Sequence, residues 1–125
     1  MMAERISVLV VMKPGPLRDS LAALLMSIPR ITAVQYAAGA GAGLRAIELS
    51  RPAMVVMDAS LPGGEVWMML RQVKVRWPAT PCVVLTDTLQ LRRRAEAAGA
   101  SRALLKGFPA AKLSVMLEQL LQQVA

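Results

Sequence analysis

Three polar residues of types that can do chemistry each stand at the end of an apolar run of this sequence. Asp58, Thr86 and Lys106 each close or directly follow a segment rich in Val, Leu and Met. The chain contains no histidine and a single cysteine, Cys82, which excludes an intramolecular disulfide, a multi-cysteine zinc site and Ser-His-Asp catalysis. Chemistry in this protein must therefore use carboxylates, lysines or hydroxyls.

The residues around these positions do not complete an enzyme site. Asp87 is the only other acid near Asp58 in the expected arrangement, which is too little for a paired-carboxylate mechanism. The sequence has no GxSxG motif, no histidine base and no aromatic pair that would hold a flavin. We therefore expect that the protein is not an enzyme.

Length and composition indicate one globular domain spanning residues 1–125. The chain has 125 residues, of which 55% are hydrophobic, enough for one core but not for two domains. No apolar run approaches the roughly 18 residues of a membrane span, and the opening residues lack the order of a signal peptide. These features predict a cytoplasmic protein without membrane contact.

Apolar runs alternate with segments of helical period along the whole chain. We expect five strands, at residues 5–11, 31–36, 53–57, 82–86 and 102–105. Leucines spaced by three and four residues between and after these runs indicate amphipathic helices. Parallel strands need such crossover helices, so the order predicts an α/β fold with a doubly wound five-stranded parallel sheet. In such sheets ligand sites lie at the carboxyl ends of the strands, where Asp58, Thr86 and Lys106 would meet.

A glycine-rich stretch between residues 37 and 43 has some likeness to a phosphate-binding loop. Gly39, Gly41 and Gly43 do not fit GxGxxG spacing, and the stretch follows the second strand rather than the first. We interpret it as a flexible connection into a short helix around Leu44, Ile47 and Leu49.

Four segments, VLVVMK, VVMDASLPGG, VVLTDT and GASRALLKGF, occur in this order and together carry a resemblance. The chain resembles the receiver domain of two-component response regulators over essentially its whole length, most closely the subgroup often joined to a helix-turn-helix DNA-binding domain. The resemblance implies a flavodoxin-like receiver fold with Asp58 at the phospho-acceptor position. It also implies that Thr86, Lys106 and the backbone carbonyl of Ser60 line the pocket.

The sequence departs from the family where Mg²⁺ would bind. Receivers carry a pair of acids after the first strand, but this chain has Met12 and Lys13 there. A thioether and an ammonium group supply no oxygen ligand, so we expect no cofactor, with Mg²⁺ binding lost or weak and no metal site. The family's aromatic switch position, three residues before Lys106, is Ala103, which has no ring to change rotamer.

Two placements of Lys13 are open from the sequence. Pointing inward, its ammonium group would take the metal's place as a fixed counter-charge, lower the pKa of Asp58 and make the pocket cationic. Pointing outward, it would extend from the strand end into solvent.

These features together predict an atypical receiver, or pseudo-receiver, of phosphorelay signalling that acts as a protein-interaction module. Its expected partners are a histidine kinase or regulator, and a second copy through the last helix. The alternatives are a nucleic-acid-associated regulator, suggested by the net charge of +7 and the run Arg92 to Arg94, or the receiver part of a longer helix-turn-helix regulator that contacts DNA through its effector domain. The stripe proposed as the dimer surface comprises Leu113, Met116, Leu117, Leu120, Leu121 and Val124.

Overall fold

The computed structural model describes residues 5–123 and contains one five-stranded, all-parallel sheet with the strand order β2-β1-β3-β4-β5. The strands are β1 (Ser7–Val11), β2 (Ala33–Ala37), β3 (Met54–Asp58), β4 (Cys82–Thr86) and β5 (Arg102–Leu105). The helices are α1 (Pro16–Met26), α2 (Ala40–Ser50), α3 (Glu65–Arg76), α4 (Leu89–Ala97) and α5 (Ala110–Gln122), and a short 3₁₀ turn covers Pro62–Gly64. The α/β doubly wound, flavodoxin-like prediction is confirmed, with strand ends displaced by at most two residues.

The strands form where the sequence has short, β-branched apolar runs, because such runs suit a sheet that is covered on both faces. Every residue of β3 and β4 is buried, as expected for strands with neighbours on both sides. The edge strand β2 is more exposed: Ala33 and Tyr36 face solvent and only Ala37 is buried. Strand order thus explains why the second apolar run is the least hydrophobic of the five.

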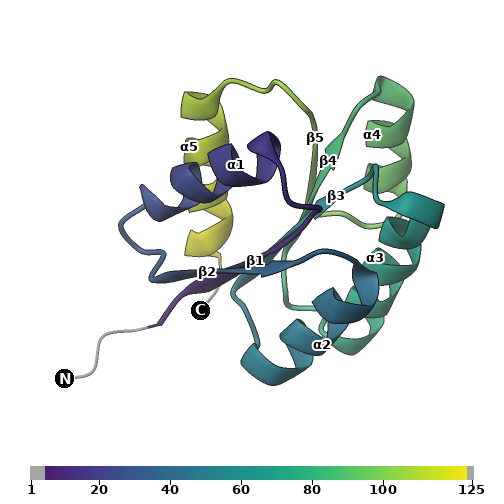
Figure 1. Cartoon of the computed structure of the whole chain (residues 1–125), viewed down its shortest axis with the longest axis horizontal. Coiled ribbons are helices and arrows are strands. Elements are labelled where there is room, and N and C mark those ends of the chain that lie inside the picture. The colour runs from purple at the N-terminus through teal and green to yellow at the C-terminus, as the bar shows by residue number, and fades with distance from the viewer. Residues whose placement is uncertain (1–4, 124–125) are drawn as a thin grey trace.

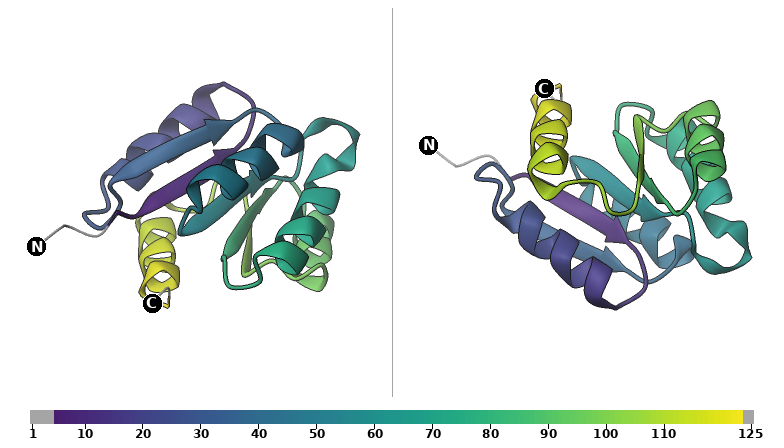
Figure 2. Two further views of the ribbon diagram at one scale, coloured as in Figure 1. Left: turned by 90° about the horizontal axis from the view of Figure 1, so that it is seen from below. Right: turned by 90° about the horizontal axis from the view of Figure 1, so that it is seen from above.

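Helices cover both faces of the sheet, so the molecule has three layers. Figures 1 and 2 show α1 and α5 on one face and α2, α3 and α4 on the other. Each layer has its own apolar core: Leu25 and Leu121 belong to the α1/α5 side, and Ile47 and Leu70 to the opposite side. The stripe expected on the last helix packs into the first of these cores. Leu117, Leu120 and Leu121 are buried, and Leu113 and Met116 pack against them. Val124 lies outside the described residues.

The glycine-rich stretch has a packing role at the start of α2. The helix begins at Ala40, earlier than expected, and includes Gly41 and Gly43. A Cβ at Gly43 would lie 2.7 Å from the Met69 methyl carbon and 3.1 Å from a Val11 methyl carbon. Gly43 therefore lets α2 lie close to the sheet.

All five strands run in one direction, so their carboxyl ends share one edge of the sheet. The strand order reverses at β1 and β3, where one connection leads outward to β2 and the others lead through β3 towards β5. Ligand sites of open α/β sheets lie at this point, and Asp58 is the last residue of β3. Among the residues that the structure describes, no helix is long and apolar enough to cross a membrane.

Candidate functional site

One oxygen of the Asp58 carboxylate collects all the hydrogen bonds of that group. Asp58 Oδ1 accepts from the backbone N–H of Ser60 at 2.9 Å, from the Ser60 hydroxyl at 2.8 Å, and lies 2.8 Å from Lys106 Nζ. No donor from residues 5–123 reaches Oδ2 within hydrogen-bonding distance. The turn after β3 positions these donors, because the Leu61 N–H donates to the Asp58 carbonyl at 3.2 Å and brings Ser60 back over the carboxylate.

Lys106 lies between two carboxylates and one hydroxyl. Its Nζ is 3.2 Å from Asp87 Oδ1 and donates to Ser60 Oγ at 3.0 Å, in addition to its ion pair with Asp58. The lysine follows β5, where its backbone N–H donates to the Thr86 carbonyl at 2.8 Å. Side chains that follow or end β3, β4 and β5 therefore meet at a single ammonium group.

The ion pair outweighs burial in setting the ionisation of both partners. Burial, the largest single influence on Asp58, favours its neutral form, but the hydrogen bonds from Lys106 and Ser60 together with the lysine's charge bring the pKa below its usual 3.8. Burial likewise works against the charged form of Lys106, and the contacts with Asp58 and Asp87 outweigh it, so the pKa of Lys106 is above 10.5. Both groups are ionised at neutral pH.

Thr86 is fully buried and its hydroxyl is already engaged. Thr86 Oγ1 donates to the carbonyl of Leu104 at 2.9 Å, across from β4 to β5. Ala103, which the resemblance places at the switch position, is buried in the core on the side of α2, α3 and α4. Thr86 and Ala103 thus lie on the neighbouring strands β4 and β5, and both side chains are buried.

The two residues after β1 differ in where they point. Met12 is 2% exposed and packs in the core beneath α1 and α5, whereas Lys13 is exposed and forms no ion pair with any acid of residues 5–123. The outward placement of Lys13 is the one observed. The cationic pocket that would follow from an inward Lys13 is therefore not formed: Asp58 and Asp87 share one ammonium group, Lys106.

Asp87 and the Ser60 side chain are the pocket residues that the sequence reasoning missed. Ser60 was expected to contribute its backbone carbonyl, but its N–H and hydroxyl contact Asp58. For Asp87, the sequence alone indicates only an acid at the same sheet edge as Asp58. Asp87 directly follows Thr86, the last residue of β4, and β4 pairs with β5. This position next to the end of β5 is the signal that Asp87 can reach Lys106.

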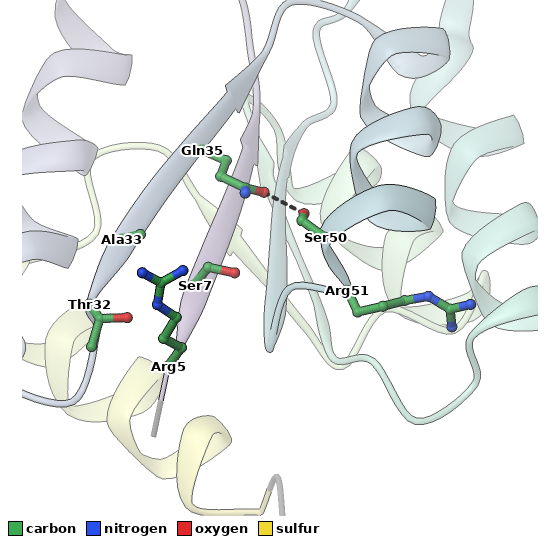
Figure 3. A pocket seen from close by; sticks show the side chains of 7 residues that line it. All are labelled: Arg5, Ser7, Thr32, Ala33, Gln35, Ser50 and Arg51. Carbon is green, nitrogen blue, oxygen red and sulfur yellow. Dashed lines mark hydrogen bonds between the residues drawn. The ribbon is translucent and has the colours of Figure 1, made fainter. Parts of the chain in front are cut away.

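Two hollows lie at opposite edges of the sheet. The larger, of about 550 Å³ and lined mostly by residues with polar side chains, is at the edge of the sheet where β1 and β2 begin and α2 ends (Figure 3). Gln35 there accepts a hydrogen bond from Ser50 at 2.8 Å, and the charged residues that line the hollow are Arg5 and Arg51. A smaller apolar groove of about 220 Å³ lies beside Lys106, and is lined by Leu17, Leu21, Leu24, Leu85, Phe108 and Leu113 among others.

Residues 8–118 match the family model described as "Response regulator receiver domain". The chain belongs to this family. No curated protein matches the sequence. Among solved structures, a putative response regulator from Chloroflexus aurantiacus J-10-fl is similar at 21% identity and a TM-score of 0.84, with 95% of this chain and 99% of that chain covered.

Two further solved structures are similar over nearly the whole domain. A CheY-like response regulator receiver domain protein from Methanospirillum hungatei JF-1 has 24% identity and a TM-score of 0.80, with 96% and 97% of the two chains covered. A two-component response regulator of the LuxR family from Aurantimonas sp. SI85-9A1 has 26% identity and a TM-score of 0.84, with 95% and 86% covered. The predicted receiver fold is confirmed by these matches, and the chain is a receiver domain of two-component signalling.

Proposed function

We propose that this receiver domain is atypical: it acts as a protein-interaction module and does not depend on Mg²⁺-assisted phosphorylation of Asp58. The observation that carries the proposal is the identity of the groups around Asp58. A buried thioether and an outward-pointing ammonium group follow β1, and the ammonium of Lys106 already contacts Asp58 Oδ1. Mg²⁺ requires several oxygen ligands at near-octahedral positions, and this donor set does not fit it.

Phosphoryl transfer is helped mainly by positioning and by neutralising the charge on the moving oxygens. In this pocket a single ammonium group carries that task, and Asp87 takes up part of its charge. A lysine is a point charge without coordination geometry, so it replaces a divalent ion poorly. Within residues 5–123 no donor reaches Asp58 Oδ2, and we expect the reaction of this carboxylate with a phosphoryl donor to be slow and independent of Mg²⁺.

The apolar groove beside Lys106 supports an interaction role. Leu17 and Phe108 are 38% and 37% exposed at this groove, where α1 meets the connection from β5 to α5. A partner that buries these side chains would contact the same sheet edge as Asp58, and apolar burial contributes about 25 cal/mol per Å². The expected partners are a histidine kinase or another regulator.

Acetyl phosphate with and without Mg²⁺, followed on a Phos-tag gel, tests the proposal. We expect the same low level of modification in both conditions, and a flat Mg²⁺ titration of the Asp58 and Ser60 amide signals by NMR at millimolar concentrations. An Mg²⁺-dependent shifted band that is absent in Asp58→Asn would overturn the proposal.

Restoring an acid after β1 should move the domain towards the ordinary behaviour of its family. Lys13→Asp introduces an oxygen ligand at an exposed position, whereas Met12→Asp would bury a carboxylate in the core, so the single change is the cleaner test. We expect Lys13→Asp to raise Mg²⁺ affinity and acetyl phosphate labelling of Asp58. Lys112→Asp on α5 changes the net charge equally and should have no effect. Equal inertness of both variants would mean that loss of the acid is not what limits the reaction.

A further inference from the structure

We infer that Asp87 is a positioning residue: it holds Lys106 between two carboxylates and links the start of α4 to β3, so that this side of the domain keeps one conformation without phosphorylation. The inference rests on the proposed function, since it explains how the domain would present a fixed surface to a partner. It concerns the 3.2 Å approach of Asp87 Oδ1 to Lys106 Nζ.

The first argument is the geometry around Lys106. Its Nζ contacts Asp58 Oδ1 at 2.8 Å, Ser60 Oγ at 3.0 Å and both carboxylate oxygens of Asp87, at 3.2 and 3.4 Å. Asp58 and Ser60 hold the ammonium from the side of β3, and Asp87 holds it from the side of β4. With Asp58 alone, the lysine would be held from one strand only.

The second argument is the position of Asp87 in the chain. Thr88, the next residue, caps α4, and its hydroxyl accepts a hydrogen bond from the Leu91 N–H at 3.1 Å. A side chain fixed at Asp87 therefore restrains the first turn of α4. The backbone already joins β4 to β5, because the Lys106 N–H donates to the Thr86 carbonyl. Asp87 adds a side-chain connection: through the ammonium group of Lys106, it is joined to Asp58 on β3.

The third argument is charge. Lys13 points into solvent, so the pocket has two carboxylates and one ammonium group. Each carboxylate is stabilised by the ammonium group that they share. If either carboxylate moved away, water would have to replace it as a hydrogen-bond partner of that ammonium group. Side-chain exposure of Asp87 is 51%, which places this link at the strength of a partly screened ion pair rather than a buried one.

The test compares Asp87→Asn, which keeps the size of the side chain and removes its charge, with Glu118→Gln, which makes the same charge change at an exposed position on α5. Amide hydrogen exchange is measured at Leu91, Arg92 and Lys106, whose N–H groups bond to Thr88 and Thr86. We expect exchange in Asp87→Asn to be about threefold to fivefold faster at these amides, and unchanged in Glu118→Gln. Asp87→Glu, which keeps the carboxylate, should restore much of the protection.

A second readout follows the ammonium group itself. The NMR titration midpoint of the Lys106 side chain should fall in Asp87→Asn and stay in place in Glu118→Gln, a change that a purely structural role would not cause. Unchanged exchange and an unchanged Lys106 titration in Asp87→Asn would overturn the inference.

The proposed function fails on a different result, Mg²⁺-dependent phosphorylation of the unaltered domain. Faster exchange in Asp87→Asn together with such phosphorylation would support the link through Asp87 while refuting the proposed function.

Discussion

At the scale of single residues, the site depends on one oxygen atom that accepts three donors. Asp58 Oδ1 holds Ser60 and Lys106 together, and the half-buried position of these groups makes their contacts stronger than those of a surface ion pair. The same contacts lower the pKa of Asp58, so its ionised form stabilises the folded state relative to the unfolded chain.

This ionisation predicts a specific dependence of stability on pH. The pKa of Asp58 is lower in the folded than in the unfolded state, so its contribution is complete above the usual value of 3.8 and is lost as the pH falls through the folded pKa. We expect Asp58→Asn to reduce the free energy of unfolding by about 1 kcal/mol at pH 7 and to flatten its decline below pH 4. Urea unfolding between pH 2 and pH 7 measures this, with Asp19→Asn on α1 as the control. A parallel decline in all three proteins would show that the pair is not a source of acid sensitivity.

At the scale of elements, α2 lies close to the sheet because of a single glycine. Gly41 and Gly43 belong to the same helix, but a Cβ at Gly41 would meet nothing within 4 Å, whereas one at Gly43 would press on Met69 and Val11. Alanine is favoured over glycine by about 1 kcal/mol within a helix. Alanine at Gly41 or at Gly43 would bring the same gain in helix propensity, but only alanine at Gly43 would crowd its neighbours.

The two alanine substitutions in α2 should separate these effects. We expect Gly41→Ala to stabilise the protein by about 0.5 to 1 kcal/mol. Gly43→Ala should be less stable than Gly41→Ala by about 1 kcal/mol or more, because Val11 on the sheet must yield even if the end of Met69 moves aside. Thermal unfolding of the two variants provides the comparison. An equal gain at both positions would mean that α2 can shift away from the sheet at little cost.

The strands and helices could be predicted from the sequence because a buried strand appears as a short apolar run and an amphipathic helix as apolar residues spaced by three and four. The five strands and the shared edge that carries Asp58, Thr86 and Lys106 followed directly from that pattern. The direction of Lys13 did not, because a lysine at a strand end can point either way without a change in the pattern. Asp87 was missed for a related reason: its contact with Lys106 depends on the lateral pairing of β4 with β5 and on the reach of two side chains.

At the scale of the whole molecule, the apolar stripe on α5 packs in the core on the α1/α5 side of the sheet. Five of its six residues pack in or against the α1/α5 core, and the sixth lies outside the described part of the chain. The large apolar side chain that α5 does expose among residues 110–122 is Val115, at 54%. One valine is far short of the roughly 800 Å² per partner that a stable dimer buries.

Sedimentation and unfolding of two α5 variants test this assignment. We expect the domain to remain a monomer at tens of micromolar, and Val115→Glu to leave stability unchanged. Leu121→Glu should destabilise the fold by about 3 kcal/mol or more, because it places a charge at a fully buried position. A dimer that Val115→Glu dissociates would show that this face of α5 mediates association.

The positive charge of the molecule favours contact with nucleic acids, and the surroundings of the arginines on α4 decide whether that helix offers a binding site. The net charge is +7, yet the run of three arginines on α4 does not form one exposed face. Arg93 and Arg94 are both exposed, but Arg94 stacks over Trp67 at 4.2 Å from the ring centre, and the Nε atom of Arg92 is buried. We therefore expect attraction to DNA through overall charge rather than through a site on α4.

Gel-shift titrations with a duplex of about 20 base pairs distinguish these two sources of binding. Counterion release makes weak phosphate contacts strongly salt dependent, so a shift at about 50 mM salt should disappear by about 200 mM and should not depend on sequence. The pair Arg92→Gln and Arg93→Gln on α4 should weaken binding no more than the pair Arg30→Gln and Arg45→Gln, two exposed arginines elsewhere that remove the same charge. Because both pairs lower the net charge by two, any excess loss from the α4 pair would locate a DNA contact on that helix. Equal losses would leave the protein-interaction role as the one that the site and its groove favour.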